Sequence, residues 1–157
     1  MNYNPRKNRN MPFDPINIVI KISVSDILRS ADFFTTLFGY KADDRYKLNS
    51  DKHFGTYSYM QLYIPGKATG FSLGLFKDIV APFEPLPQTG TVPSFIVTDI
   101  NETLTYLQSH HVVIDIIDGK FIQTNVSDEG YEDQFFFFRD PDNNSFVMRQ
   151  NISKTDC

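Results

Sequence analysis

Every second residue over residues 16–24 is apolar, and this spacing predicts a β-strand. The apolar face of that strand consists of Ile16, Ile18, Ile20, Ile22 and Val24. Apolar residues then recur at helical spacing over residues 27–38, after the capping residues Ser25 and Asp26 and before Gly39. Further alternating runs predict strands over residues 40–48, 53–64 and 70–77.

The same order of elements recurs in the second half. A strand is predicted over residues 91–98, and Asp99 opens a helix with Ile100, Leu104 and Leu107 on one face. The junction Val24-Ser25-Asp26-Ile27 recurs as Val97-Thr98-Asp99-Ile100, 73 positions later. Strands follow over residues 112–117, 121–126, 134–139 and 145–150. A unit of strand, helix and three strands cannot bury both faces of its sheet, so two such units are expected to pair.

The last two strands flank the sequence Asp140-Pro141-Asp142-Asn143-Asn144, which is typical of a tight turn. Proline presets φ, and Asp and Asn side chains hydrogen-bond the local backbone. We therefore interpret both aspartates first as turn formers.

These patterns predict an arm, two modules and a tail. The expected ranges are an N-terminal arm at 1–15, a first βαβββ module at 16–77, a Pro-rich linker at 78–90, a second module at 91–150 and a tail at 151–157.

Composition narrows the functional classes. The net charge is −4 without a basic stripe, which argues against nucleic-acid binding. No apolar run approaches the length of a membrane span, and the one cysteine is the last residue, so we expect a cytoplasmic protein without disulfides. The 15 Phe and 8 Tyr are numerous enough to line a pocket for a flat ligand as well as a core.

The tandem βαβββ repeat resembles the vicinal oxygen chelate superfamily, which includes glyoxalase I, bleomycin-resistance proteins and extradiol dioxygenases. The resemblance rests on Val24-Ser25-Asp26 with Phe33-Phe34 and Leu37-Phe38-Gly39, on Phe95-Ile96-Val97-Thr98-Asp99, and on Phe138-Arg139-Asp140-Pro141-Asp142-Asn143-Asn144. It implies an α+β fold, in which two tandem βαβββ modules form a curved mixed sheet around a cup. One departure is His110-His111, where the second helix usually ends in Gly.

The resemblance also implies where a divalent metal ion would be held. Those positions fall on Val19, on Ser72 (or Gly74 if the register slips by two), on Val92 and on Val147. None offers an imidazole, carboxylate or thiolate donor, so we expect no metal and no cofactor. The three histidines, His53, His110 and His111, are interpreted as surface residues.

A small-molecule ligand is expected on the face of the cup that carries those positions. The predicted ligand-binding residues are Lys21, Tyr57, Tyr59, Gln61, Ser72, Phe136, Phe138, Val147 and Arg149. Lys21 and Arg149 would meet an anionic or carbonyl group, or else reach solvent near strand ends. The tyrosines would stack on a flat ligand, or else cover a dimer interface.

Three functions stay open on the sequence. The first is a ligand-binding protein of the bleomycin-resistance type, which sequesters an aromatic or carbonyl-bearing molecule in a metal-free cup. The second is a metal-independent lyase, isomerase or cyclase, in which Lys21, Tyr59 or Arg149 would act in proton transfer or oxyanion stabilisation. The third is a metal-dependent glyoxalase or dioxygenase with relocated ligands. The resemblance also favours a homodimer.

Overall fold

The computed structural model describes residues 12, 17–51, 53–67 and 71–152. Within them the elements follow in the order β1 (Val19–Ser23), α1 (Ile27–Phe38), β2 (Lys41–Leu48), β3 (Tyr59–Tyr63), β4 (Ser72–Phe76), β5 (Ser94–Ile96), α2 (Ile100–Ser109), β6 (Gln123–Val126), β7 (Glu132–Arg139) and β8 (Ser145–Ile152). The predicted arm lies outside the described residues except for Pro12. Of the predicted tail, residues 151 and 152 extend β8, and the rest lies outside the described residues.

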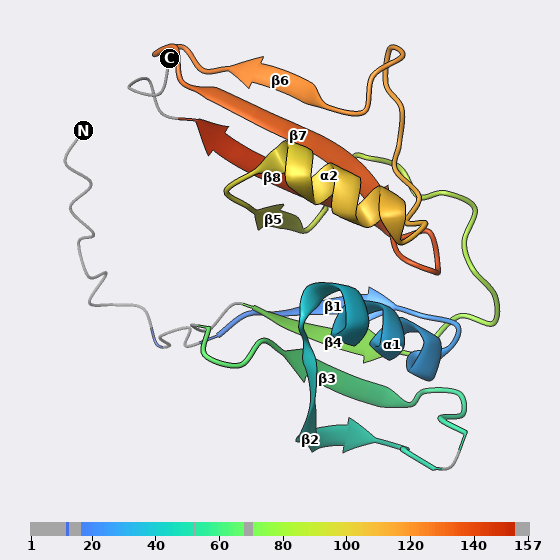
Figure 1. The fold of residues 1–157 in the computed structure, drawn as a ribbon. Coiled ribbons are helices and arrows are strands. Elements are labelled where there is room, and N and C mark those ends of the chain that lie inside the picture. The colour runs from blue at the N-terminus through green and yellow to red at the C-terminus, as the bar shows by residue number, and fades with distance from the viewer. Residues whose placement is uncertain (1–11, 13–16, 52, 68–70, 153–157) are drawn as a thin grey trace.

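The strands form two four-stranded mixed sheets, each covered by one helix (Figure 1). Their strand orders are β1-β4-β3-β2 and β5-β8-β7-β6. In each sheet the first strand of the module runs parallel to the last, and the other neighbours are antiparallel. This arrangement confirms the predicted α+β fold of two βαβββ modules.

Both helices begin with the predicted aspartate cap. The carboxylate of Asp26 accepts from the Arg29 N–H at 3.0 Å, and that of Asp99 accepts from the Glu102 N–H at 3.0 Å. Gly39 ends α1 in a left-handed conformation, with φ 76°. After α2 the left-handed position is occupied by His111, with φ 60°, where a glycine would be less strained.

Two predicted strands are shorter than their sequence pattern. β3 begins at Tyr59 and not at residue 53, because Tyr57 has a φ of 62° that interrupts the extended backbone. Residues 112–117 contribute isolated bridges, such as Ile114 with Phe138, in place of a regular strand. Residues 77–93 connect the two sheets without a helix or strand.

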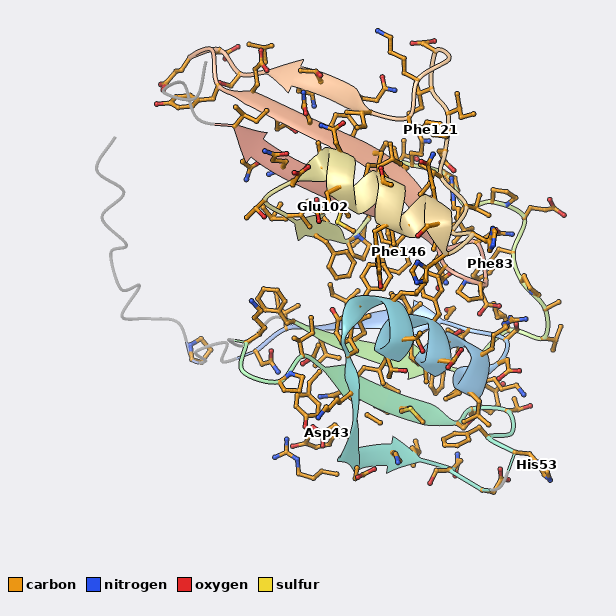
Figure 2. All side chains as sticks on the ribbon, in the orientation of Figure 1. Asp43, His53, Phe83, Glu102, Phe121 and Phe146 are labelled. Atoms are coloured by element: carbon orange, nitrogen blue, oxygen red, sulfur yellow. The ribbon has the colours of Figure 1, made fainter. Side chains whose placement is uncertain are left out.

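A shared aromatic core joins the modules. Phe34 of α1 contacts Phe146 of β8 with ring centroids 5.6 Å apart, and Phe38 stacks on Phe138 of β7 at 5.5 Å. The equivalent residues of the repeat, Phe34 and Leu107, are both fully buried. In Figure 2 the labelled Phe146 lies between the two sheets. The modules therefore bury their helix-covered faces in one continuous core.

Asp142 of the β7–β8 turn fastens this turn to the start of α1. Its side chain is fully buried and accepts hydrogen bonds from the Ser25 hydroxyl, from Arg29 Nη2 at 3.1 Å and from the Ser30 hydroxyl at 3.3 Å. Asp142 is therefore more than the turn former that the sequence predicted. It is the buried anion between the modules, and three donors of the first module compensate its desolvation.

Asp140 shapes the turn itself. Its carboxylate accepts from the backbone N–H of Asp142 at 3.0 Å and of Asn144 at 2.9 Å. Burial raises the pKa of Asp140 to about 6, with a further increase from the neighbouring Asp142 charge, while the hydrogen bonds from Asn144 oppose the shift. The turn-forming role predicted for Asp140 agrees with these bonds.

Replacing Asp142 with alanine should lower the free energy of unfolding by about 3 kcal/mol, because Ser25, Arg29 and Ser30 lose their buried acceptor. Urea denaturation followed by circular dichroism measures this change. The matched control is Asp128→Ala in an exposed loop, which should shift stability by less than about 0.5 kcal/mol. Equal effects of the two substitutions would contradict the role given to Asp142.

Candidate functional site

The faces of the two sheets opposite the helices form the candidate site, which we call the cup face. Alternation along each strand places these side chains there. From the first module they include Val19, Lys21, Ser23, Lys41, Tyr59, Gln61, Tyr63, Ser72, Gly74 and Phe76, and from the second Ser94, Ile96, Asp133, Phe135, Phe137, Arg139, Ser145, Val147, Arg149 and Asn151. The site is therefore divided between two walls, one per module.

Phe136 and Phe138 were wrongly predicted to line the cup. Both are fully buried in the shared core, where Phe136 pairs with Met148 and Phe138 with Phe146. The cup face of β7 instead carries Phe135, opposite Arg149, and Phe137, opposite Val147. Directly paired residues of antiparallel strands share a face, so the register across the turn decides which phenylalanines face the cup.

Tyr59 lies flat on the first wall. A Cβ added to Gly74 would lie 2.6 Å from the Tyr59 hydroxyl oxygen and 2.8 Å from its Cε2, so the ring fills the space above the glycine. The hydroxyl donates to Gln61 Oε1 at 3.0 Å. Burial raises the pKa of Tyr59 above its ordinary value. Tyr59 thus offers an aromatic surface, and its hydroxyl is already hydrogen-bonded to Gln61.

Lys21 is paired with an acid at the start of the connecting segment. Its ammonium donates to Asp78 and, at 2.7 Å, to the Ser23 hydroxyl, and it lies 5.5 Å from the Phe76 ring centroid. Burial opposes ionisation of Asp78, but the hydrogen bonds from Lys21 and Ser23 outweigh it and lower the pKa of Asp78. The charge of Lys21 on the cup face is therefore compensated by Asp78.

A second ion pair, more deeply buried than the first, closes one end of the other wall. Arg139 is nearly fully buried and donates from Nε and Nη2 to the two oxygens of Asp115, at 3.0 and 2.7 Å. It also donates from Nη1 to the carbonyl of Leu86 and, at 2.6 Å, to the Ser145 hydroxyl. This arginine fixes the connecting segment against the sheet.

Arg149 is less closely paired than Lys21 and Arg139. Its Nε is buried and has no hydrogen-bond partner among the described residues, since Asp133 Oδ2 lies 4.0 Å away. Arg149 borders a hollow of about 350 Å³, which Ser127, Tyr131, Glu132, Asp133, Asn151 and Ile152 also line. A donor of this kind is available for a ligand oxygen.

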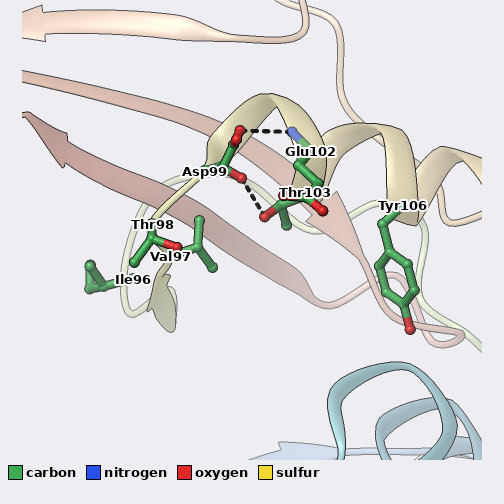
Figure 3. Close-up of a pocket in the computed structure, with 7 residues that line it drawn as sticks. All are labelled: Ile96, Val97, Thr98, Asp99, Glu102, Thr103 and Tyr106. Carbon is green, nitrogen blue, oxygen red and sulfur yellow. Dashed lines mark hydrogen bonds between the residues drawn. The ribbon is translucent and has the colours of Figure 1, made fainter.

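Two further hollows follow the strip between the walls. One, of about 250 Å³, is bordered by β1, the connecting segment and the start of β8, and the other, of about 190 Å³, by β1, β4 and β5. A larger hollow of about 510 Å³ lies at the β5–α2 junction (Figure 3). In this hollow the Asp99 carboxylate accepts a hydrogen bond from the Glu102 N–H, and the Thr103 hydroxyl donates one to the Asp99 carbonyl. The polar groups there cap a helix, so we do not assign the site to this hollow.

The residues at the implied metal positions do not fit a metal ion. Val19, Val92 and Val147 have no donor atoms in their side chains, and Ser72 offers one buried hydroxyl. Across the part of the chain that the structure describes, no group of three or more His, Cys, Asp or Glu side chains is placed to hold a metal. No step of a metal-assisted reaction can be derived from this donor set.

The structure brings part of the predicted set together. Lys21 lies on β1, which borders the strip between the walls. Ser72, Val147 and Arg149 lie one strand farther out, on β4 and β8, and Tyr59 and Gln61 lie on β3. Tyr57 lies before β3, is 62% exposed and contacts the Phe76 ring at 6.1 Å. Phe135, Phe137 and the two acids Asp78 and Asp115 were not among the residues predicted from the sequence.

Comparison with known proteins identifies the fold. No protein-family model and no curated protein sequence matches the chain. Among solved structures, a glyoxalase/bleomycin resistance protein/dioxygenase from Alicyclobacillus acidocaldarius is 16% identical, with a TM-score of 0.62 over 96% of this chain and 98% of that one. Glyoxalase I of Leishmania major is 21% identical, with a TM-score of 0.59 over 86% of each chain. An antibiotic-binding protein from Streptomyces is 17% identical, with a TM-score of 0.55 over 90% and 98%.

The chain therefore has the fold of the glyoxalase/bleomycin-resistance/dioxygenase superfamily, as the sequence resemblance implied. Neither of the two described helices is long and apolar enough to cross a membrane.

Gly74→Ala should lower the free energy of unfolding by about 1–3 kcal/mol, because the new methyl group displaces the Tyr59 ring. A double-mutant cycle with Tyr59→Ala tests this cause. In the Tyr59→Ala background the methyl group has room, so the cost of Gly74→Ala should fall to less than about 0.5 kcal/mol. A cost that stays the same in both backgrounds would show that Tyr59 does not occupy this space.

Proposed function

We propose that the protein binds a small, uncharged aromatic molecule that carries a carbonyl group, and holds it in the cup without a metal ion. The ligand would be sequestered and released unchanged, as in the bleomycin-resistance type of protein. The observation that carries this proposal is the distribution of charge on an otherwise aromatic cup face.

Two cations of the cup face are held in close ion pairs, a third, Arg149, lies 4.0 Å from Asp133, and a fourth, Lys41, is on the outer strand β2. Lys21 is paired with Asp78, and Arg139 with Asp115. Apart from these cations and Asp133, the face presents the rings of Tyr59, Phe135 and Phe137 and a few neutral polar groups. A charged ligand would have to break an ion pair or lose its hydration without compensation, whereas an uncharged aromatic ligand keeps both pairs intact.

Arg149 supplies the polar end of the proposed site. A buried N–H without a partner costs free energy in the unliganded protein, and a ligand acceptor that reaches it recovers that cost. Asp133 and Glu132 border the same hollow, and their negative charges disfavour a carboxylate there. A neutral carbonyl oxygen satisfies the donor without this repulsion.

The absence of donors at the implied metal positions supports binding without a metal. The Streptomyces structure with the same fold is described as an antibiotic-binding protein, so the fold is compatible with ligand sequestration. A metal-independent lyase or isomerase acting on the same ligand is the competing function. Chromatography and mass analysis of the ligand after incubation distinguish the two, because a binding protein returns the ligand unchanged.

Two properties remain predictions. A homodimer is expected from the resemblance, and light scattering of the purified protein tests it. A cytoplasmic location is expected from the sequence, and fractionation of the source cells tests that.

A thermal-shift screen against uncharged aromatic antibiotics and quinones should yield ligands that stabilise the protein. For such a ligand, Arg149→Ala should weaken binding about tenfold by isothermal titration calorimetry, because one hydrogen bond to a charged donor is lost. The matched control is Arg45→Ala, an exposed arginine paired with Asp43 on β2, which should leave the affinity unchanged. Unchanged affinity in Arg149→Ala would exclude our placement of the polar end.

A further inference from the structure

A strip along the floor of the cup separates the two sheets, and we call it the seam. It is bordered by β1 on one side and β5 on the other, and these strands belong to separate sheets. The two hollows of about 250 and 190 Å³ both lie along it and share Ile20 and Pro93 in their linings. The seam is thus an elongated space between two strand edges.

The backbone of β1 presents a free edge to the seam. The Val24 N–H donates to the Phe76 carbonyl at 3.0 Å, so Val24 and the alternate residues before it face β4. The carbonyl of Ser23 points the other way and accepts from Asn144 Nδ2 at 2.9 Å. By the same alternation, the N–H and C=O groups of Val19 and Lys21 face the seam, and β1 has no strand partner there among the described residues.

The backbone of β5 presents a matching edge. The Val147 N–H donates to the Pro93 carbonyl, and the Val97 N–H donates to the Arg149 carbonyl, both at 2.8 Å. Residues 93, 95 and 97 therefore face β8, and the N–H and C=O groups of Ser94 and Ile96 face the seam. Two rows of backbone groups that have no strand partner within the described ranges thus border one space, and backbone groups without partners are costly wherever water is excluded.

From this geometry we propose that the seam is a docking slot for an extended, uncharged peptide segment, which inserts as a strand between β1 and β5. An extended backbone carries N–H and C=O groups on both of its edges, so it can pair with both strands at once. The proposal goes beyond the proposed function and does not depend on it, since it uses backbone groups at the floor and not the aromatic walls.

The lining of the seam defines the chemistry of the segment. It combines aliphatic side chains such as Ile20, Val92 and Pro93 with the hydroxyls of Thr91 and Ser94. Lys21 is the one charged residue that lines either hollow, and it is already paired with Asp78. Small β-branched and hydroxyl-bearing residues fit this surface, whereas a charged residue would lack a partner.

The seam is closed at one end, and no described residue closes the other. The Asn144–Ser23 hydrogen bond closes the end beside the β7–β8 turn. At the other end Ile18, Phe71 and Ile96 are 63%, 44% and 55% exposed, an apolar group that is unusual beside an open strand edge. We place the entry of the peptide at this exposed end, where its insertion would cover all three side chains.

The test uses the full chain and the peptide acetyl-(Thr-Val)3-amide. Fluorescence anisotropy of a labelled peptide measures affinity, and ¹⁵N NMR of the protein locates binding. The slot predicts saturable binding, with shifted and more slowly exchanging amide protons at Val19, Lys21, Ser94 and Ile96. An otherwise identical peptide that is N-methylated on one edge should bind about tenfold or more weakly, because the slot needs both edges.

The N-methylated peptide distinguishes binding in the seam from binding at the outer strands β2 and β6, because pairing with an outer strand uses only one edge of the peptide. Equal binding of the two peptides, or shifts confined to β2 or β6, would overturn the proposal, as would failure of the first peptide to bind. Ile96→Pro removes one seam-facing N–H that has no strand partner, so the variant should fold and bind about tenfold more weakly. The matched control Val80→Pro, at a fully exposed aliphatic residue in the connecting segment, should bind as the unmodified protein does.

Discussion

The buried carboxylate of Asp142 is the interaction on which the arrangement of the two modules depends. A buried carboxylate without partners would be strongly unfavourable, and here Ser25, Arg29 and Ser30 at the start of α1 all donate to it. The aromatic contacts between α1 and the second sheet add apolar burial but little directional information. Asp142 therefore fixes the position and rotation of one module against the other.

The same turn connects this constraint to the candidate site. Asp140 organises the turn backbone, and β8 then carries Ser145, Val147 and Arg149 along the cup face. Asn144 of the turn bonds the end of β1, which brings β1 and β5 to either side of the seam. The walls, the seam and the position of Arg149 are thus consequences of how one turn docks on one helix.

Much of the fold could be predicted from the sequence because its signals are local. Asp26, Asp99 and Gly39 define the helix ends by hydrogen bonds within a few residues, and the duplicated junction reveals the two modules. The phenylalanines of β7 were assigned to the wrong face, because alternation shows which residues share a face but not which side of the sheet that face is on. The pairing of Phe137 with Val147 across the turn identifies the cup face of β7, but this pairing follows only from the register of the hairpin.

Contacts distant in sequence were not predictable in the same way. Asp142 and Ser25 are 117 positions apart in the sequence, and Lys21 and Asp78 are 57 apart. No pattern along the chain predicts either contact. Tyr57 was placed in a strand because its neighbours alternate, yet its positive φ comes from a local turn that the alternation conceals. Only the structure therefore shows that Lys21 and Arg139 are closely paired and that the Nε of Arg149 has no hydrogen bond to a described residue.

The central claim is that the cup binds its ligand without a metal ion. Native mass spectrometry of the protein, dialysed against a chelator and then mixed with a ligand from the thermal-shift screen, tests it most directly. The account predicts a complex whose mass equals protein plus ligand, formed as readily as before dialysis. Loss of the complex after dialysis, with recovery on adding a divalent metal ion, would contradict the account.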